Sequence, residues 1–291
     1  MNFENFDEKI GLEGYYRYIM NSFFPNSNEN SFDFCQFKAE SRIFKKGSRF
    51  FRVRKLTEDD LKRFFNKNEK INKKEFFPPK PEIIDIGRFN SANERVLYLA
   101  EQAIVAIKEC DIKNEDHFLL SIMSIKTDMS FIHLKKDNPN KLTQILYKLL
   151  NSSDRRFYPL INKIYSKLLD FTEMNGIIYD SVKFEGNSIF RNLVIKNEYI
   201  QDVSMVVSTL NLMVDGKPLS KIIFKPNSQK KLNKIGRIFY SDNRKNFINE
   251  SYAIFKSIDD NNLRLISHIE NGLYKKEDIN PIKIIEKDES M

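Results

Sequence analysis

The sequence predicts an α+β protein, because helical patterns dominate its first half and strand patterns its second half. Apolar residues recur with helical spacing between positions 103 and 110 and between 142 and 149. Further on, Ile177–Val182, Phe190–Ile195 and Val203–Val214 have the lengths and the branched residues of strands. With 291 residues, 41% of them hydrophobic, the chain can bury a large core. Segregated helices and strands of this kind are typical of the α+β class.

The opening part of the chain predicts two short helices separated by a loop at Asn26–Ser31. A short extended run follows at Phe50–Val53. Thr57 then precedes three acidic residues, which is the pattern of a capped polar helix. The three prolines of Phe76–Pro81 predict that this helix ends in an extended loop.

The middle of the chain predicts a strand at Val96–Ala100 that leads directly into a helix at Glu101–Cys110. A strand at Phe118–Ile125 and a helix at Asn140–Leu150 follow. One long helix is expected over Arg155–Met174, with Asp154 as its cap and Asn175-Gly176 as its stop.

The last part predicts a turn at Asp215–Pro218 after the strand Val203–Val214, and then a strand at Leu219–Phe224. A final hairpin is expected from Tyr252–Ile258 and Leu263–Ile269, before a charged end at Lys287–Met291.

Several function classes are disfavoured by composition. The N-terminus lacks the basic and apolar stretches of a secretory signal, and no apolar run reaches the roughly 20 residues of a membrane span. The two cysteines, Cys35 and Cys110, are interpreted as packing residues of a cytoplasmic protein. The three histidines (His117, His133 and His268) lie apart, without partners at metal-ligand spacing, so no metal site is expected.

The net charge of +8 is concentrated in residues 42–80, which hold 14 Lys or Arg and 5 Asp or Glu. Such a block can meet nucleic acid, an acidic partner or a phosphorylated small molecule, or can simply be a solvated face. Charge alone does not choose among these.

Four segments stand out when they are read in chain order. They are Phe51–Arg54, Gly87–Asn90, Val96–Ala100 with Glu109 nine residues later, and Gly176–Ser181 with Asn192–Val194. Their order and spacing resemble the RES-domain family, which is named for an arginine, a glutamate and a serine. The resemblance covers residues 48–200 and is most specific between Gly87 and Glu109. Family members usually place a proline and a glycine soon after the Gly-Arg-aromatic-Asn motif, whereas this chain has Ser91–Glu94.

The resemblance implies a fold similar to ADP-ribosyltransferases, with a mixed sheet core and flanking helices. It also implies NAD⁺ cleavage to nicotinamide and an ADP-ribosyl product, by phosphorolysis, hydrolysis or transfer to a protein. NAD⁺ would be the substrate rather than a cofactor, with inorganic phosphate as a candidate co-substrate. The family further suggests a toxin whose partner is a helix-turn-helix antitoxin. On this basis residues 47–225 are the expected catalytic domain, residues 1–46 an N-terminal helical extension and residues 226–291 a C-terminal extension packed on the core.

The resemblance places Glu109, Arg88 and Ser181 in the catalytic set and Arg52, Tyr98 and Asn192 in NAD⁺ binding. The residue types suit these roles. Nicotinamide leaves NAD⁺ without protonation, so one carboxylate can suffice to stabilise the ribosyl cation. Arginine forks bind pyrophosphate oxygens, a tyrosine can stack on nicotinamide, and serine and asparagine can bond its carboxamide or a ribose hydroxyl.

Each of these residues also has a plainer interpretation. Glu109 can be a surface residue at a helix end, and the arginines can be solvated charges, with Arg54 as a substitute for Arg52. Tyr98 can be core packing, and Ser181 and Asn192 ordinary polar residues at strand ends. Two other functions stay open: ADP-ribosylation of a protein, and nucleic-acid binding through residues 42–80. Neither a Rossmann nor a Walker glycine motif nor a Gly-x-Ser-x-Gly turn occurs in the sequence.

Overall fold

The computed structural model describes residues 1–25, 34–136, 138–184, 190–226, 235–254, 256 and 282–286. Within them the helices are α1 (Gly11–Phe23), α2 (Glu58–Phe65), α3 (Ala103–Glu109), α4 (Lys141–Leu150) and α5 (Tyr158–Ile164), and residues 244–254 are also helical. Shorter helical turns are η1 (Lys73–Phe76), η2 (Pro81–Ile83), η3 (Arg155–Phe157), η4 (Tyr165–Leu169) and η5 (Asn197–Asp202).

The strands are β1 (Phe34–Lys38), β2 (Ser41–Phe44), β3 (Arg49–Lys55), β4 (Leu97–Ala100), β5 (His117–Ile125), β6 (Met129–His133), β7 (Gly176–Asp180), β8 (Arg191–Ile195), β9 (Val203–Val214), β10 (Lys217–Pro226), β11 (Ile235–Phe239) and β12 (Ile282–Glu286).

Ten of these strands form one sheet in the order β11-β10-β9-β5-β3-β4-β8-β7-β6-β2, while β1 pairs with β12. The pairing is antiparallel except between β6 and β7, which run parallel, so the sheet is mixed. Helices and a large mixed sheet together confirm the predicted α+β class.

The sheet is packed on both faces. The residues at β4 show this division: Leu97 and Leu99 lie in one core cluster, whereas Ala100 and Val96, which directly precedes the strand, lie in clusters on the other side. On that second side the core has two parts. One is formed with α1, α4 and α5 and the other with α3 and Phe247.

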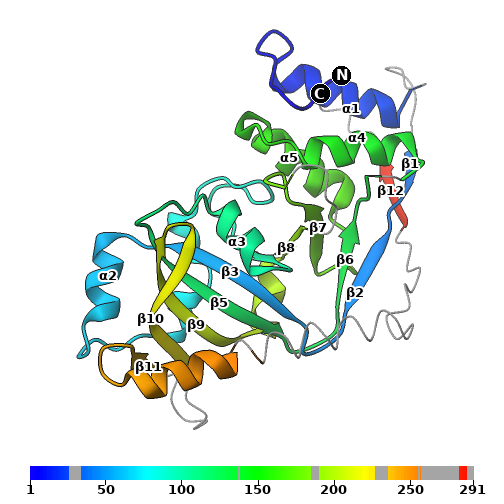
Figure 1. Cartoon of the computed structure of the whole chain (residues 1–291). Coiled ribbons are helices and arrows are strands. Elements are labelled where there is room, and N and C mark those ends of the chain that lie inside the picture. The colour runs from blue at the N-terminus through cyan, green and yellow to red at the C-terminus, as the bar shows by residue number, and fades with distance from the viewer. Residues whose placement is uncertain are drawn as a thin grey trace.

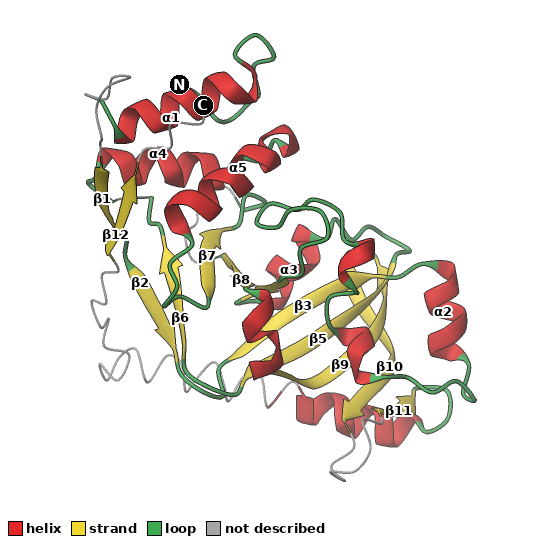
Figure 2. Cartoon of the chain, turned by 180° about the vertical axis from the view of Figure 1, so that it is seen from behind, coloured by secondary structure: helices red, strands yellow, loops and turns green. Residues whose placement is uncertain are grey.

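The helices gather at separate ends of the molecule. In Figures 1 and 2, α1, α4 and α5 lie together beside β6 and β7, whereas α2 and the helix over residues 244–254 lie near β10 and β11. The helix α3 lies between these ends, over the middle of the sheet. On this face of the sheet, the core cluster with α1, α4 and α5 and the core cluster with α3 are separate. The middle of the sheet lies between them and can hold a site.

Several local predictions are confirmed by the backbone. Thr57 caps α2, since its side chain accepts from the Asp60 amide and the Asp60 carboxylate accepts in return from the Thr57 amide. Asn140 caps α4 through its side-chain oxygen. The predicted strand Val203–Val214 matches β9 in both bounds, and Asp215 and Gly216 form the following turn with positive φ.

Other local predictions are wrong. The expected helix over Arg155–Met174 is divided into η3, α5 and η4 and ends at Leu169, with Pro159 in the first turn of α5. No second N-terminal helix follows α1 in the described residues; strands β1 and β2 occupy that stretch. The chain over residues 252–254 is helical rather than extended. Asn26–Ser31, Leu263–Ile269, His268, Lys287–Met291 and the side chain of Cys35 lie outside the described residues.

The predicted domain boundaries at residues 46 and 225 do not coincide with the limits of the sheet. Strand β2 pairs with β6, and β11 pairs with β10, so residues on both sides of each boundary belong to one sheet. None of the helices in the described part of the chain has the length and apolarity that a membrane span requires.

Candidate active site

A cavity of about 540 Å³ opens where strands β3 and β4 separate. The two strands share a single register pair, Phe51 with Ala100, and residues of both line the cavity. The helix α3 and the segment of residues 78–90 form further walls. Its volume is in the range of cavities that hold cofactor-sized ligands. Five of the six residues that the sequence analysis selected line this cavity: Arg52, Arg88, Tyr98, Glu109 and Asn192.

The sixth residue, Ser181, is buried directly behind the cavity wall and contacts Glu109. Its hydroxyl donates to Oε1 of Glu109 at 2.6 Å. The side-chain amide of Asn192 donates to the same oxygen at 2.9 Å. Among the described residues, no hydrogen-bond partner is found for Oε2 of Glu109. The carboxylate is therefore held through one oxygen, and the other stays open for a ligand.

Three different elements bring this triplet together. Glu109 is the last residue of α3, which follows β4 after a two-residue connection. Asn192 lies on β8, paired with Ala100 of β4 on one side and with Tyr179 of β7 on the other. Ser181 directly follows β7, where its amide donates to the Phe190 carbonyl at 2.7 Å. The interpretation of Glu109 as a solvated helix-end residue does not fit these contacts, since its carboxylate is half-buried and bonded.

Arg88 lies at the tip of a tight turn. The Gly87 amide donates to the Asn90 carbonyl at 3.0 Å and closes the turn. The Asn90 side chain donates to the carbonyls of Asp85 and Ser91, and Asn162 donates to the Gly87 carbonyl. A side chain at Gly87 would meet Asn90 Oδ1 at 2.3 Å, so only glycine fits there. The backbone that carries Arg88 is thus fixed from several sides.

The guanidinium of Arg88 is buried, with 7% of the residue exposed. It packs against the rings of Tyr179 and Tyr158, with its Cζ 5.2 and 5.7 Å from their centroids. Its Nη2 donates to the Ser152 carbonyl at 3.1 Å, while Nη1 is buried without a hydrogen-bond partner. A buried charged donor without an acceptor is costly. An anionic ligand in the cavity would lower that cost.

The loop after this turn, over Ser91–Glu94, contains one non-glycine residue with a positive φ. Asn93 has φ +64°, which lies in the left-handed region where glycine is favoured and asparagine is tolerated. Its amide donates to the Ile84 carbonyl, and the Glu94 carboxylate accepts from the Ser91 amide at 2.8 Å. Asn93 therefore allows the tight bend without a glycine.

Arg52 faces the opposite side of β3 from Phe51 and Val53, yet it lines the cavity because the strands diverge. Its Nη1 donates to the Phe76 carbonyl at 3.3 Å. Burial lowers the pKa of its guanidinium to about 10, and the nearby positive charges of Arg54 and Arg95 act in the same direction. Arg52 is therefore still charged at neutral pH. Arg54 does not line the cavity, because its Nη2 binds both oxygens of Asp60 at 2.8 Å.

Tyr98 lines the cavity, but its hydroxyl is engaged in the Arg88 turn. It accepts from the Phe89 amide and donates to Asn90 Oδ1, both at 2.9 Å. Burial raises the pKa of this hydroxyl, so it remains a donor. The contacts are those of a residue that holds the turn in place, and stacking of its ring on nicotinamide stays a prediction.

No protein-family model and no curated protein sequence matches this chain.

The sequence analysis missed the two aromatic residues that flank Arg88. Tyr179 lies within Gly176–Ser181, and its alternation with Ile178 along β7 places it on the face that bears the cavity. No sequence pattern indicated that Tyr158 lies at the site. The expected helix over Arg155–Met174 included this residue, whereas in the structure α5 begins at it.

Cys110 lies next to Glu109 and lines the same cavity. Burial raises the pKa of its thiol to about 11, and its Sγ lies 3.5 Å from the Val53 carbonyl. The thiol is therefore protonated at neutral pH and packs as the sequence analysis expected. In the described part of the chain, no three His, Cys, Asp or Glu side chains come together as metal ligands would.

The basic block of residues 42–80 does not form a uniform positive face. Seven of its 14 Lys and Arg residues form ion pairs with carboxylates in the described structure: Arg42, Lys45, Arg54, Lys55, Lys62, Arg63 and Lys67. Four of the partner carboxylates (Glu101, Asp116, Asp128 and Asp242) lie outside the block, so part of its excess positive charge is neutralised locally, which weakens the nucleic-acid interpretation.

Proposed function

We propose that the cavity beside Glu109 binds NAD⁺ and that the chain cleaves the bond between nicotinamide and ribose. The observation that carries this proposal is the pair of hydrogen bonds from Ser181 and Asn192 to one oxygen of Glu109. A carboxylate that is oriented by two side chains and open on its other oxygen is suited to act on a reacting centre. Arg88 and Arg52 in the same cavity supply positive charge for a diphosphate.

The proposed reaction needs only one carboxylate. The C1′–N bond of NAD⁺ breaks with its electron pair passing to the cationic pyridinium ring, so nicotinamide leaves neutral and needs no proton. The positive charge that develops on the ribose is stabilised by the Glu109 carboxylate. Oxygen Oε2 can also orient water, phosphate or a protein side chain, whose oxygen forms the new bond to C1′ and whose proton passes to the solvent or to the carboxylate.

The arginines would position the substrate rather than react with it. Guanidinium groups bind phosphate oxygens through paired hydrogen bonds and keep their charge. Arg88 has a buried Nη1 without an acceptor, and Arg52 lies among other cations. Both conditions favour a bound anion.

The finer features follow from the resemblance to the RES-domain family and belong to the same proposal. They are an ADP-ribosyltransferase-like arrangement of the mixed sheet, inorganic phosphate as co-substrate, and a toxin that is held by a helix-turn-helix antitoxin. One structural feature supports a covering partner: the cavity wall carries Ile83 and Ile86, whose exposed fractions are 73% and 45%. A partner protein can bury apolar side chains that are exposed beside a site.

The direct test is incubation of the purified chain with NAD⁺, with and without inorganic phosphate, followed by separation of the products. We expect nicotinamide release by the wild type and a loss of at least about 100-fold in Glu109→Gln, since an oriented charge at the reacting centre is worth that much. Glu82→Gln is the matched control, because Glu82 is exposed and does not line the cavity. Full activity of Glu109→Gln would overturn the mechanism.

The products identify the nucleophile. A phosphorylated ADP-ribose that forms only with phosphate present indicates phosphorolysis, and free ADP-ribose indicates hydrolysis. With NAD⁺ labelled in its ADP-ribose part, label on protein would indicate ADP-ribosyl transfer instead.

A further inference from the structure

A second cavity of about 400 Å³ lies beside the first one. Ile86, Glu94 and Val96 line both cavities, so the segment that carries Arg88 forms their common wall. On β8, Asn192 belongs to the first cavity and Val194 to the second. Residues two positions apart on a strand share a face and are roughly 7 Å apart. The second cavity therefore lies on the same face of the sheet as the first one, further along strand β8.

The base of this cavity is aromatic. The rings of Phe89 and Tyr165 meet edge to face, with their centroids 5.6 Å apart. Tyr165 is 8% exposed, and its hydroxyl forms no hydrogen bond with any residue in the described ranges. Burial, followed by the charges of Asp170, Glu94 and Glu198, raises the pKa of this hydroxyl. Tyr165 and these three carboxylates line the cavity together.

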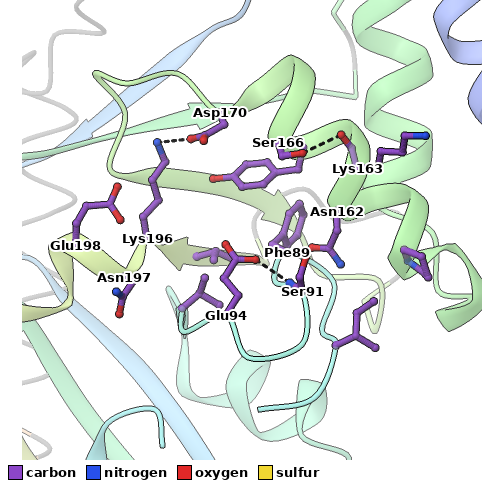
Figure 3. Close-up of a pocket in the computed structure, with 15 residues that line it drawn as sticks. Phe89, Ser91, Glu94, Asn162, Lys163, Ser166, Asp170, Lys196, Asn197 and Glu198 are labelled. Atoms are coloured by element: carbon purple, nitrogen blue, oxygen red, sulfur yellow. Dashed lines mark hydrogen bonds and ion pairs between the residues drawn. The ribbon is translucent and has the colours of Figure 1, made fainter. Parts of the chain in front are cut away.

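The rim of the cavity is acidic (Figure 3). Its two lysines are already engaged: Lys196 binds Asp170 at 2.6 Å and the Phe171 carbonyl at 2.8 Å, and the Lys163 ammonium lies 3.6 Å from the Tyr16 ring. Glu94 and Glu198 form no ion pair with any described residue. The cavity lining thus holds three carboxylates and two ammonium groups, and Glu94 and Glu198 are the two carboxylates without an ion pair to a described residue.

We propose that this second cavity binds a small organic cation with a primary ammonium or guanidinium group. Carboxylates accept charge-assisted hydrogen bonds from such a group, and aromatic rings attract it. The Tyr165 hydroxyl, which lacks a partner, completes the set as an acceptor for one ammonium proton. The inference does not depend on NAD⁺ cleavage, because Tyr165 and Glu198 line only the second cavity, although Glu94 lines both.

The test is calorimetric titration of the full chain with putrescine at low ionic strength, with butane-1,4-diol as the uncharged probe of equal length. We expect saturable binding of putrescine at one site per chain and no binding of the diol. Glu94→Gln and Glu198→Gln should each weaken putrescine binding about three- to tenfold. Tyr165→Phe, which removes only the hydroxyl, should weaken it by a smaller factor.

Glu82→Gln is again the matched control, because it removes one exposed charge from the same stretch of chain without touching either cavity. Equal weakening by Glu82→Gln and Glu198→Gln would show diffuse attraction and overturn the site. Absence of saturable binding would overturn it as well. Unchanged putrescine binding in Glu198→Gln would place the cation outside the second cavity and contradict the site, because Glu198 lines only that cavity. Each of these results is independent of whether NAD⁺ is cleaved.

Discussion

The Ser181 hydroxyl lies 2.6 Å from Oε1 of Glu109, although 72 positions separate the two residues in the chain. Asn192 adds its amide at 2.9 Å to the same oxygen. The carboxylate is thus oriented by the ends of two neighbouring strands rather than by the helix that carries it. Two donors on one oxygen limit its rotation and keep Oε2 available to a ligand.

Ser181→Ala should lower kcat for nicotinamide release about ten- to 100-fold with little change in KM. The reason is that a hydrogen bond to a charged group contributes about 1.5 to 3 kcal/mol, and this one acts on the reacting carboxylate rather than on the substrate. Initial rates over a range of NAD⁺ concentrations measure the effect. Ser22→Ala is the control, since Ser22 bonds the Tyr18 carbonyl within α1, away from the cavity. A rise in KM at constant kcat would contradict the positioning role.

Gly87→Ala should displace Arg88 and raise KM for NAD⁺ by about tenfold or more. The added Cβ would lie 2.3 Å from Asn90 Oδ1 and 2.8 Å from the Tyr98 hydroxyl, so the turn must shift. A displacement of this size moves the guanidinium away from the substrate and typically weakens the binding of the substrate strongly. Gly236→Ala is a control with the same chemical change, because its nearest neighbour would be 3.6 Å away. Equal kinetics for the two variants would show that the turn does not position Arg88.

Arg88→Lys should raise KM for NAD⁺ about tenfold or more, even though the charge is kept. A lysine loses the planar fork that can bind two phosphate oxygens and the packing against Tyr179 and Tyr158. Steady-state kinetics, with circular dichroism to confirm folding, measure this change. If lysine functions as well as arginine, the site needs only a positive charge at this position.

His133 should make folding sensitive to mild acid. Burial, followed by the charges of Arg191, Arg42 and Lys135, lowers its pKa to about 3, whereas in the unfolded chain it is about 6.5. Between these values only the unfolded chain takes up the proton. The stability linked to the neutral imidazole is therefore fully present above pH 6.5 and is lost as pH falls toward 3.

Urea unfolding at pH 7.5 and pH 5.0 can measure this contribution. The wild type should lose about 2 kcal/mol more than His133→Gln over that interval, because glutamine does not titrate there. An equal loss in both proteins would mean that His133 binds a proton in the folded state.

The sequence predicted those parts of the structure whose signals are local. The cap at Thr57, the apolar spacing of α3 and the strand β9 each depend on neighbouring residues, and all three are confirmed. The six selected residues also lie at or directly beside one cavity, and they were selected because the order and spacing of their segments resemble a known family.

The remaining parts depend on contacts distant in sequence. Strand β6 is short, and it exists because β2 and β7 pair with its two edges. The segment after Arg155 has helical apolar spacing throughout, but it ends at Leu169 where the chain turns into the core at Phe171 and Met174. The proposed cation site beside Tyr165 combines residues from three separate segments, and no local pattern in the sequence indicates it.

The single register pair between β3 and β4 divides the sheet into two five-stranded halves. Strong ladders hold each half internally, so their amides should be protected from hydrogen exchange as two cooperative units with a weak seam between them. Arg52 belongs to one unit, whereas Asn192, Ser181 and Arg88 are tied to the other. Side chains of both strands pack together on each face of the sheet and join the halves, so a ligand that contacts Arg52 and Arg88 at once would bridge two separately hydrogen-bonded units.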